Sequence, residues 1–188
     1  MSIENTLNGM KILILVSNGV DEGSMSNVQR ELLKTGAAIK TVGIESGLVN
    51  SWNNNAWGLY FPVDQTMSVT LGSDFDALVV PSGSRSVQKL SASAHSERII
   101  ASFVEAGKPM AFVGDAVELL AKIGLATGWN VAGPEGVRDA MTAAGATWEG
   151  TGSTVHNILL TGEAADQVAF VSDIVAHFQD KTEMKAAA

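Results

Sequence analysis

The sequence contains no cysteine, which excludes disulfide bonds, thiolate metal ligands and a cysteine nucleophile within these 188 residues. Positive charge is also scarce. Twelve lysine and arginine residues stand against twenty aspartate and glutamate residues, so the formal net charge is −8. The basic residues are scattered along the chain. Binding to nucleic acid is therefore not expected, because phosphate contacts need clustered cations.

Long apolar runs are absent as well. No stretch approaches the roughly 20 apolar residues that span a bilayer. The first nine residues lack the basic region with which a signal peptide begins. We therefore expect a cytoplasmic protein with no membrane partner. The 46% hydrophobic content is typical of a globular domain, and we expect one domain, 1–188, whose tail at 181–188 frays.

Short apolar runs rich in β-formers alternate with amphipathic helical stretches, which indicates a parallel sheet covered by helices. The run 11–17 suits a strand buried on both faces, 76–81 is a second buried strand, and 37–44 and 108–113 are further strands of the central sheet. Between the second and third runs, aromatic and β-branched residues flank three asparagines at 53–55, which favours a hairpin. The pattern predicts an α/β fold, a three-layer α/β/α sandwich with a mainly parallel central sheet.

In such a sheet, ligands bind beyond the carboxyl ends of the strands, where the strand order reverses. This rule selects the segments 18–24, 82–86 and 114–116, all of which we expect to be loops. Their polar and glycine residues are the candidate ligand-binding residues. These are Asp21, Glu22, Ser82, Gly83, Arg85, Gly114 and Asp115.

Five short motifs occur in a fixed order. The first strand leads into Asn18-Gly19-Val20-Asp21, the third ends in Pro81-Ser82-Gly83, and the fourth runs from Gly107-Lys108-Pro109 to Gly114-Asp115. The run from Pro134 to Asp139 and the run from His156 to Thr161 follow. Together they resemble the motifs of the ThiJ/PfpI family, part of the class I glutamine amidotransferase-like superfamily. The resemblance implies the flavodoxin-like form of the α/β/α sandwich.

A narrower similarity concerns Gly19-Val20-Asp21 and Gly114-Asp115-Ala116. This pair is similar to the C-terminal domain of large-subunit catalases, which shares the fold, binds no haem and lacks the family's nucleophile. Nothing in the sequence resembles the catalase haem domain. Peroxide dismutation is therefore not implied.

The family resemblance also implies a catalytic arrangement that this sequence does not keep. In active members, a cysteine at a strand-to-helix turn is the nucleophile, a carboxylate from the first loop approaches it, and amides of the second loop hold an oxyanion. The matching positions here are Gly114 for the cysteine, Asp115 for the following histidine and Asp21 for the glutamate. We therefore predict a vestigial site in a non-catalytic domain for binding, scaffolding or stress protection, with no cofactor and no metal.

Two alternatives stay open. A hydrolase or lyase would use Asp115 and Asp21 in place of the thiol, with the two carboxylates sharing a proton; a sensor would keep the family pocket for a small molecule. Asp115 is also interpreted as a cap of a helix expected at 116–123. Glu22 competes with Asp21 as the inward carboxylate of the first loop.

The remaining polar candidates have simpler interpretations. Ser82, Ser84 and Ser86 are expected to bond local backbone in a turn, and Arg85 to be a solvated loop residue. The histidines His95, His156 and His177 are expected near the surface, where they make poor general bases.

Aromatic residues make up 6% of the chain, yet four of them fall within about ten residues of the expected hairpin. Such a cluster on a protruding hairpin favours a subunit interface, because aromatic side chains supply much of the binding energy of interfaces. We therefore expect a homodimer or a larger assembly. The candidate contact residues are Trp52, Trp57, Tyr60 and Phe61.

Overall fold

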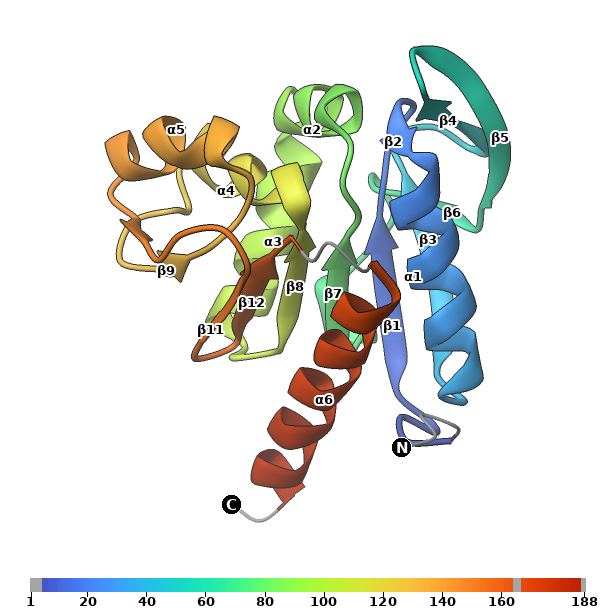
Figure 1. Ribbon diagram of the computed structural model, residues 1–188. Helices are drawn as coiled ribbons and strands as arrows, with labels where there is room; N and C mark the ends of the chain where they lie inside the picture. The colour runs from blue at the N-terminus through green and yellow to red at the C-terminus, as the bar shows by residue number, and fades with distance from the viewer. Residues whose placement is uncertain (1–4, 164–166, 187–188) are drawn as a thin grey trace.

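The computed structural model describes residues 5–163 and 167–186 and has a seven-stranded sheet at its centre (Figure 1). In sheet order the strands are β11 (Ser153–His156), β12 (Leu159–Gly162), β8 (Met110–Val113), β7 (Ala77–Val80), β1 (Lys11–Leu15), β3 (Ala38–Gly43) and β6 (Gln65–Thr66). Neighbouring strands run parallel, except that β11 is antiparallel to β12. The four predicted strands are confirmed, and β8 lies between β12 and β7 rather than at an edge.

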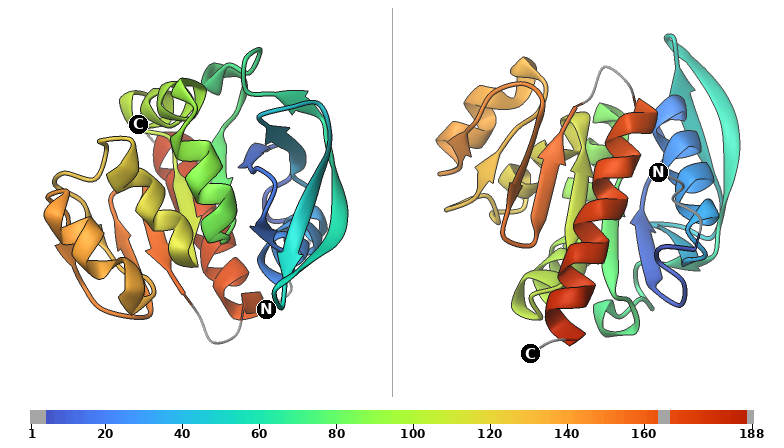
Figure 2. Two further views of the ribbon diagram at one scale, coloured as in Figure 1. Left: turned by 90° about the horizontal axis from the view of Figure 1, so that it is seen from above. Right: turned by 60° about the horizontal axis from the view of Figure 1, so that its bottom comes forward.

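Helices cover both faces of this sheet (Figures 1 and 2). One face holds α1 (Glu22–Lys34) and α6 (Gln167–Ala186). The other holds α2 (Ser84–Ser91), α3 (Ala94–Glu105), α4 (Glu118–Lys122) and α5 (Arg138–Ala143). Short 3-10 turns lie at Gly72–Asp74 (η1), Gly114–Val117 (η2) and Glu135–Val137 (η3), and β9 (Asn130–Val131) pairs with β10 (Thr147–Trp148). The predicted flavodoxin-like three-layer sandwich is confirmed.

Alternation along each central strand produces two separate cores. Ile12 and Ile14 pack in the cluster with α1 and α6, whereas Leu13 and Leu15 pack in the cluster with α2, α3 and α4. Successive side chains of a strand point to opposite faces of the sheet. A strand covered on both faces must therefore be apolar at every position, which explains the unbroken apolar runs of the sequence.

A second sheet stands at the carboxyl end of the first. It consists of β2 (Val20–Asp21), β4 (Gly47–Asn53) and β5 (Ala56–Val63), and β4 and β5 form the predicted hairpin. The turn residues Asn54 and Asn55 have φ angles of 46° and 63°. Positive φ at both central residues matches the right-handed twist of a two-residue hairpin, and asparagine tolerates this conformation. The hairpin projects past the ends of the central strands (Figure 1).

The segment that was expected to fray includes the end of the last helix. The helix α6 continues through residues 181–186, while 187 and 188 lie outside the described residues. His177 is not at the surface either, because α6 lies along the face of the sheet and leaves this side chain 5% exposed. Its Nε2 lies 2.9 Å from the carbonyl oxygen of Ile158, to which the N–H donates. None of the helices in the described part combines the length and apolarity that crossing a bilayer requires.

The burial of His177 predicts a pH dependence of stability. Burial lowers the pKa of its imidazole below the ordinary 6.5, although the bond to Ile158 favours the protonated form. As the pH falls below 6.5, the unfolded chain takes up a proton that the folded chain does not, so the free energy of unfolding decreases. The loss of unfolding free energy between about pH 7.5 and about pH 5.5 should be smaller in His177→Gln than in the wild type. Urea unfolding at several pH values measures this free energy. His95→Gln, at an exposed position, is the control and should lose as much as the wild type; an equal loss in the wild type and in His177→Gln would contradict this account.

Candidate functional site

The strand order reverses between β1 and β7, because the chain leaves β1 toward β3 on one side and later adds β7 on the other. Ligand sites of doubly wound sheets lie at the carboxyl ends of such a strand pair. Here the segments that follow β1, β7 and β8 meet. They bring together Asp21, Ser82, Gly83 and Asp115, as expected from the sequence.

Asp115 joins two of these segments. Its Oδ1 accepts hydrogen bonds from the Ser82 hydroxyl at 2.8 Å and from the Gly83 amide at 2.7 Å. The predicted capping role is corrected by this geometry, since the carboxylate reaches across to the neighbouring segment instead of bonding its own helical turn. Gly83 is the N-cap residue of α2, so the carboxylate lies where a helix N-terminus stabilises negative charge.

The segment at 82 and 83 is also fixed from the side of β2. The Ser82 amide donates to the Ser24 hydroxyl at 3.0 Å, and the Ser82 carbonyl accepts from the Asp21 amide at 2.8 Å. A Cβ atom built on Gly83 would lie 2.6 Å from the Asp21 amide nitrogen and 2.7 Å from the Cα of Val20. Only glycine fits such a close approach of two backbones. The backbone of β2 therefore takes up the space beside Gly83 in the crevice between β1 and β7. Ser24, which completes it, was not identified from the sequence.

The two aspartates are bound to different groups. Asp21 caps α1, because its Oδ1 accepts from the Ser24 amide at 2.7 Å, while Asp115 is held by Ser82 and Gly83. This arrangement does not favour the hypothesis of a shared proton, which requires two carboxylates in direct contact.

Glu22 faces the hairpin rather than the crevice. Its carboxylate accepts from the Leu59 amide at 2.7 Å, from the Ser51 hydroxyl at 2.8 Å and from the Asn53 side chain at 2.9 Å. The Leu59 amide, followed by the Ser51 hydroxyl, holds the pKa of this carboxyl below its ordinary value. Glu22 therefore fastens the hairpin to α1, and it is not the inward carboxylate of the first loop.

The serine-rich segment that was expected to be a loop is helical from Ser84 onward. Ser86 is buried, and its hydroxyl accepts from the Ser17 amide at 2.9 Å, which ties α2 to the end of β1. Arg85 is not simply solvated, since its guanidinium lies 3.9 Å from the centre of the Trp52 ring. The ring of Trp57 meets Trp52 edge-on at 5.1 Å. Charge on an aromatic face and edge-to-face rings are both favourable contacts.

The histidines lie away from the crevice. His95 is exposed in the first turn of α3, and the Nδ1 of His156 accepts from the Asn130 amide at 3.0 Å. His177 lies on α6 and is buried where this helix packs on the sheet. Within the described ranges, no three histidine, aspartate or glutamate side chains converge as the ligands of a metal ion would.

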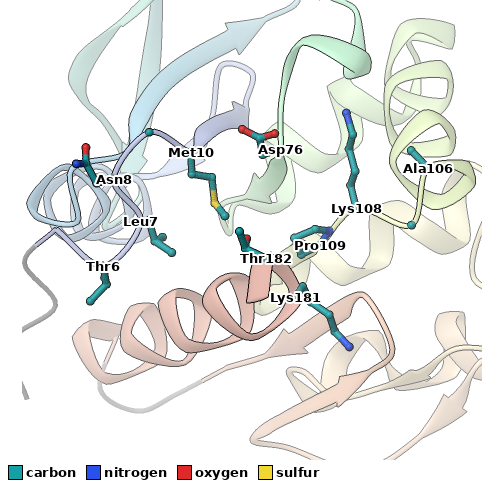
Figure 3. Close-up of a pocket in the computed structure, with 12 residues that line it drawn as sticks. Thr6, Leu7, Asn8, Met10, Asp76, Ala106, Lys108, Pro109, Lys181 and Thr182 are labelled. Atoms are coloured by element: carbon teal, nitrogen blue, oxygen red, sulfur yellow. The ribbon is translucent and has the colours of Figure 1, made fainter. Parts of the chain in front are cut away.

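A cavity of about 560 Å³ lies at the opposite, amino-terminal edge of the sheet (Figure 3). Its lining includes Leu7, Met10 and Pro109, with Asp76 and Lys181 as polar members. Figure 3 shows the Lys108 ammonium turned away; it donates instead to the backbone carbonyls of residues 72, 73 and 75. None of the residues predicted from the sequence to form a site lines this cavity.

A model of the DJ-1/PfpI family matches residues 10–177. The chain belongs to the DJ-1/PfpI family. The predicted resemblance to ThiJ/PfpI proteins is thus confirmed.

Two curated relatives and one solved structure illustrate the family likeness. Catalase HPII of Pseudomonas aeruginosa is 27% identical over 65% of this chain, which corresponds to 17% of the catalase. "Putative cysteine protease YraA" of Bacillus subtilis is 26% identical over 85% of this chain and 93% of that protein. A two-domain protein of Anabaena variabilis with DJ-1/ThiJ/PfpI-like and ferritin-like domains superposes with a TM-score of 0.81 at 22% identity, over 88% of this chain and 47% of that one. The chain thus spans less than half of the catalase and of the two-domain protein.

The contacts of Gly114 predict that a side chain there is costly. Its φ of +56° is left-handed, and a Cβ would lie 2.9 Å from the Ser82 hydroxyl oxygen. Gly114→Ala should lower the free energy of unfolding by about 1–3 kcal/mol, measured by urea denaturation. Gly128→Ala is the control, because Gly128 has a φ of +83° with nothing within 4 Å of the added atom. If Gly114→Ala loses no more stability than Gly128→Ala, the crowding by Ser82 is disproved.

Proposed function

We propose that this chain is a non-catalytic DJ-1/PfpI domain that acts by binding and association. The observation that supports the proposal is the Asp115 carboxylate, which occupies the Gly83 amide and the Ser82 hydroxyl. In the family arrangement, amides of this segment are the donors that hold an oxyanion. An oxyanion hole works only when its donors are free to meet the charge that develops in the transition state.

The other donor of this segment is also engaged, because the Ser82 amide bonds the Ser24 hydroxyl. The sequence has no cysteine, so thiol chemistry of the kind named for the Bacillus relative has no nucleophile here. A side chain at position 114 would in addition press on Ser82. The amide donors of this segment are therefore already engaged, and a thiol nucleophile is absent from the sequence.

The carboxylate enzyme is the weaker alternative. A carboxylate attacks best when its lone pairs are free, yet Asp115 accepts two hydrogen bonds on one oxygen at the start of α2. Those bonds stabilise the anion and make it a poorer nucleophile. A sensor that uses the family crevice is disfavoured as well, because the backbone of β2 fills the space beside Gly83.

Activity assays test this proposal. Deglycation, glyoxalase and peptidase rates should equal those of buffer alone, and iodoacetamide should change nothing because the sequence offers no thiol. Asp115→Asn should behave as the wild type in all three assays. Asp139→Asn, at an exposed position, is the charge-matched control. Turnover above background that persists in Asp139→Asn and vanishes in Asp115→Asn would establish the aspartate enzyme instead.

A second candidate function, association with another copy, has its own support. On the hairpin, Trp57 is 52% exposed and Tyr60 is 63% exposed, and Leu48 and Leu59 are exposed as well. The prediction that Phe61 is a contact residue is corrected, since Phe61 is buried in the chain's own core. Trp52 is partly covered by the side chain of Arg85. An apolar surface of this kind is typical of a contact region, and pairing about a two-fold axis buries the same patch of both subunits.

Light scattering tests the association. At micromolar concentration the mass should be at least twice the 19.6 kDa of the chain. Trp57→Ala should shift the distribution toward monomer, because tryptophan is a residue type that dominates interface energies. Val155→Ala, which shortens an exposed apolar side chain of β11 at the far edge of the sheet, should leave the mass unchanged. A wild-type chain that stays monomeric would refute this proposal.

A further inference from the structure

A groove of about 530 Å³ lies between α2 and β4, at the carboxyl ends of β1 and β3. It is distinct from the crevice, which lies on the other side of β1. Its volume falls within the range of small-molecule sites, and its place is one where α/β sheets bind ligands. The lining residues are Ser17, Asn18, Ile44, Glu45, Leu48, Val49, Lys89, Ala92 and Ser93.

The floor of the groove holds a hydroxyl group without a partner. Ser17 is 4% exposed, and its amide donates to the Ser86 hydroxyl. The Ser17 side chain lines the groove, and its hydroxyl forms no hydrogen bond with any residue that the structure describes. The Ser17 hydroxyl is not wholly buried and opens into the groove, where it can meet a partner from outside the chain.

Two further donors stand near Ser17. The side-chain oxygen of Asn18 is used by the Asn50 amide at 2.8 Å, which directs the NH₂ group of Asn18 away from that bond. Lys89 follows Ser86 by three residues on α2 and so lies on the same side of the helix. Its ammonium has no ion pair within 4 Å in the described part of this acidic chain. The Trp57 ring lies 5.9 Å from it.

The rest of the lining is mainly apolar. Ile44, Leu48, Val49 and Ala92 contribute aliphatic side chains. Glu45, also in the lining, forms no ion pair among the residues that the structure describes. Its negative charge disfavours an anionic group on its own side of the groove, because like charges repel strongly where water is partly excluded.

We propose that this groove binds a small aliphatic monocarboxylate. The carboxylate accepts hydrogen bonds from the Ser17 hydroxyl, the Asn18 amide and the Lys89 ammonium, and the aliphatic part lies on the side chains of residues 44, 48, 49 and 92. Charge-assisted bonds supply the selectivity for an anion, and burial of the aliphatic part supplies affinity. The site does not include Asp115, so its failure would leave the proposed absence of catalysis unaffected.

A matched pair of probes tests the charge of the ligand. Isovalerate and isopentylamine share one branched carbon skeleton and carry opposite charges. Titrated into the ¹⁵N-labelled full chain, isovalerate should give saturable shifts at the amides of residues 17, 18 and 89, and isopentylamine should give none there. Equal binding of both probes, shifts located elsewhere, or no saturable response to isovalerate would overturn the proposal.

Variants test the residues. Lys89→Gln should raise the dissociation constant for isovalerate about tenfold or more, because a charge-assisted bond is lost, and Ser17→Ala should raise it by a smaller factor. Lys40→Gln removes the same charge at an exposed position on β3 and should bind as the wild type does. Amide spectra outside the groove report that each variant is folded. If Lys89→Gln and Lys40→Gln bind isovalerate equally, the assigned site is wrong.

Discussion

Burial of the central strands on both faces is the constraint from which the rest of this structure follows. Ile12 and Leu13 are neighbours in sequence but enter different cores, so the interior of β1 has no place for a polar side chain. The backbone groups of these strands are satisfied by the parallel ladder. In β1, β7 and β8, polar side chains are therefore confined to the strand ends. The polar groups of the candidate sites lie at the carboxyl edge, in the segments that follow these strands.

Two places at this edge are used in opposite ways. In the turn after β8, Asp115 supplies the chain's own anion, since its carboxylate accepts from the segment at 82 and 83 that follows β7. A carboxylate at a helix N-terminus is a stabilising contact. Gly114 permits it, because the left-handed backbone there turns the chain without placing a side chain against Ser82. The turn after β8 thus forms an internal hydrogen bond to the segment after β7.

The sequence predicted the layers and the central strands well, because a short, unbroken apolar run between turn residues is typical of a strand buried on both faces. The sequence did not predict the side-chain contacts that join separate segments. The turn at Gly114 was found, yet nothing in the spacing indicates that Asp115 bonds Gly83 across the crevice. The start of α2 was missed because its first turn is rich in serine, although Val87 and Leu90 already had helical spacing. His177 was expected to be exposed from its place near the chain end, but α6 lies flat on the sheet.

The two cations of α2 lie beside the tryptophan rings of the hairpin. In a chain with a net charge of −8, Arg85 and Lys89 are held one helical turn apart, and their charges lie near the rings of Trp52 and Trp57 rather than in ion pairs with described residues. An aromatic face attracts a cation without neutralising its charge. The two cations therefore keep their full attraction for an anion at the carboxyl edge. For Lys89, that attraction acts at the groove beside β1, where the Ser17 hydroxyl has no partner among the described residues.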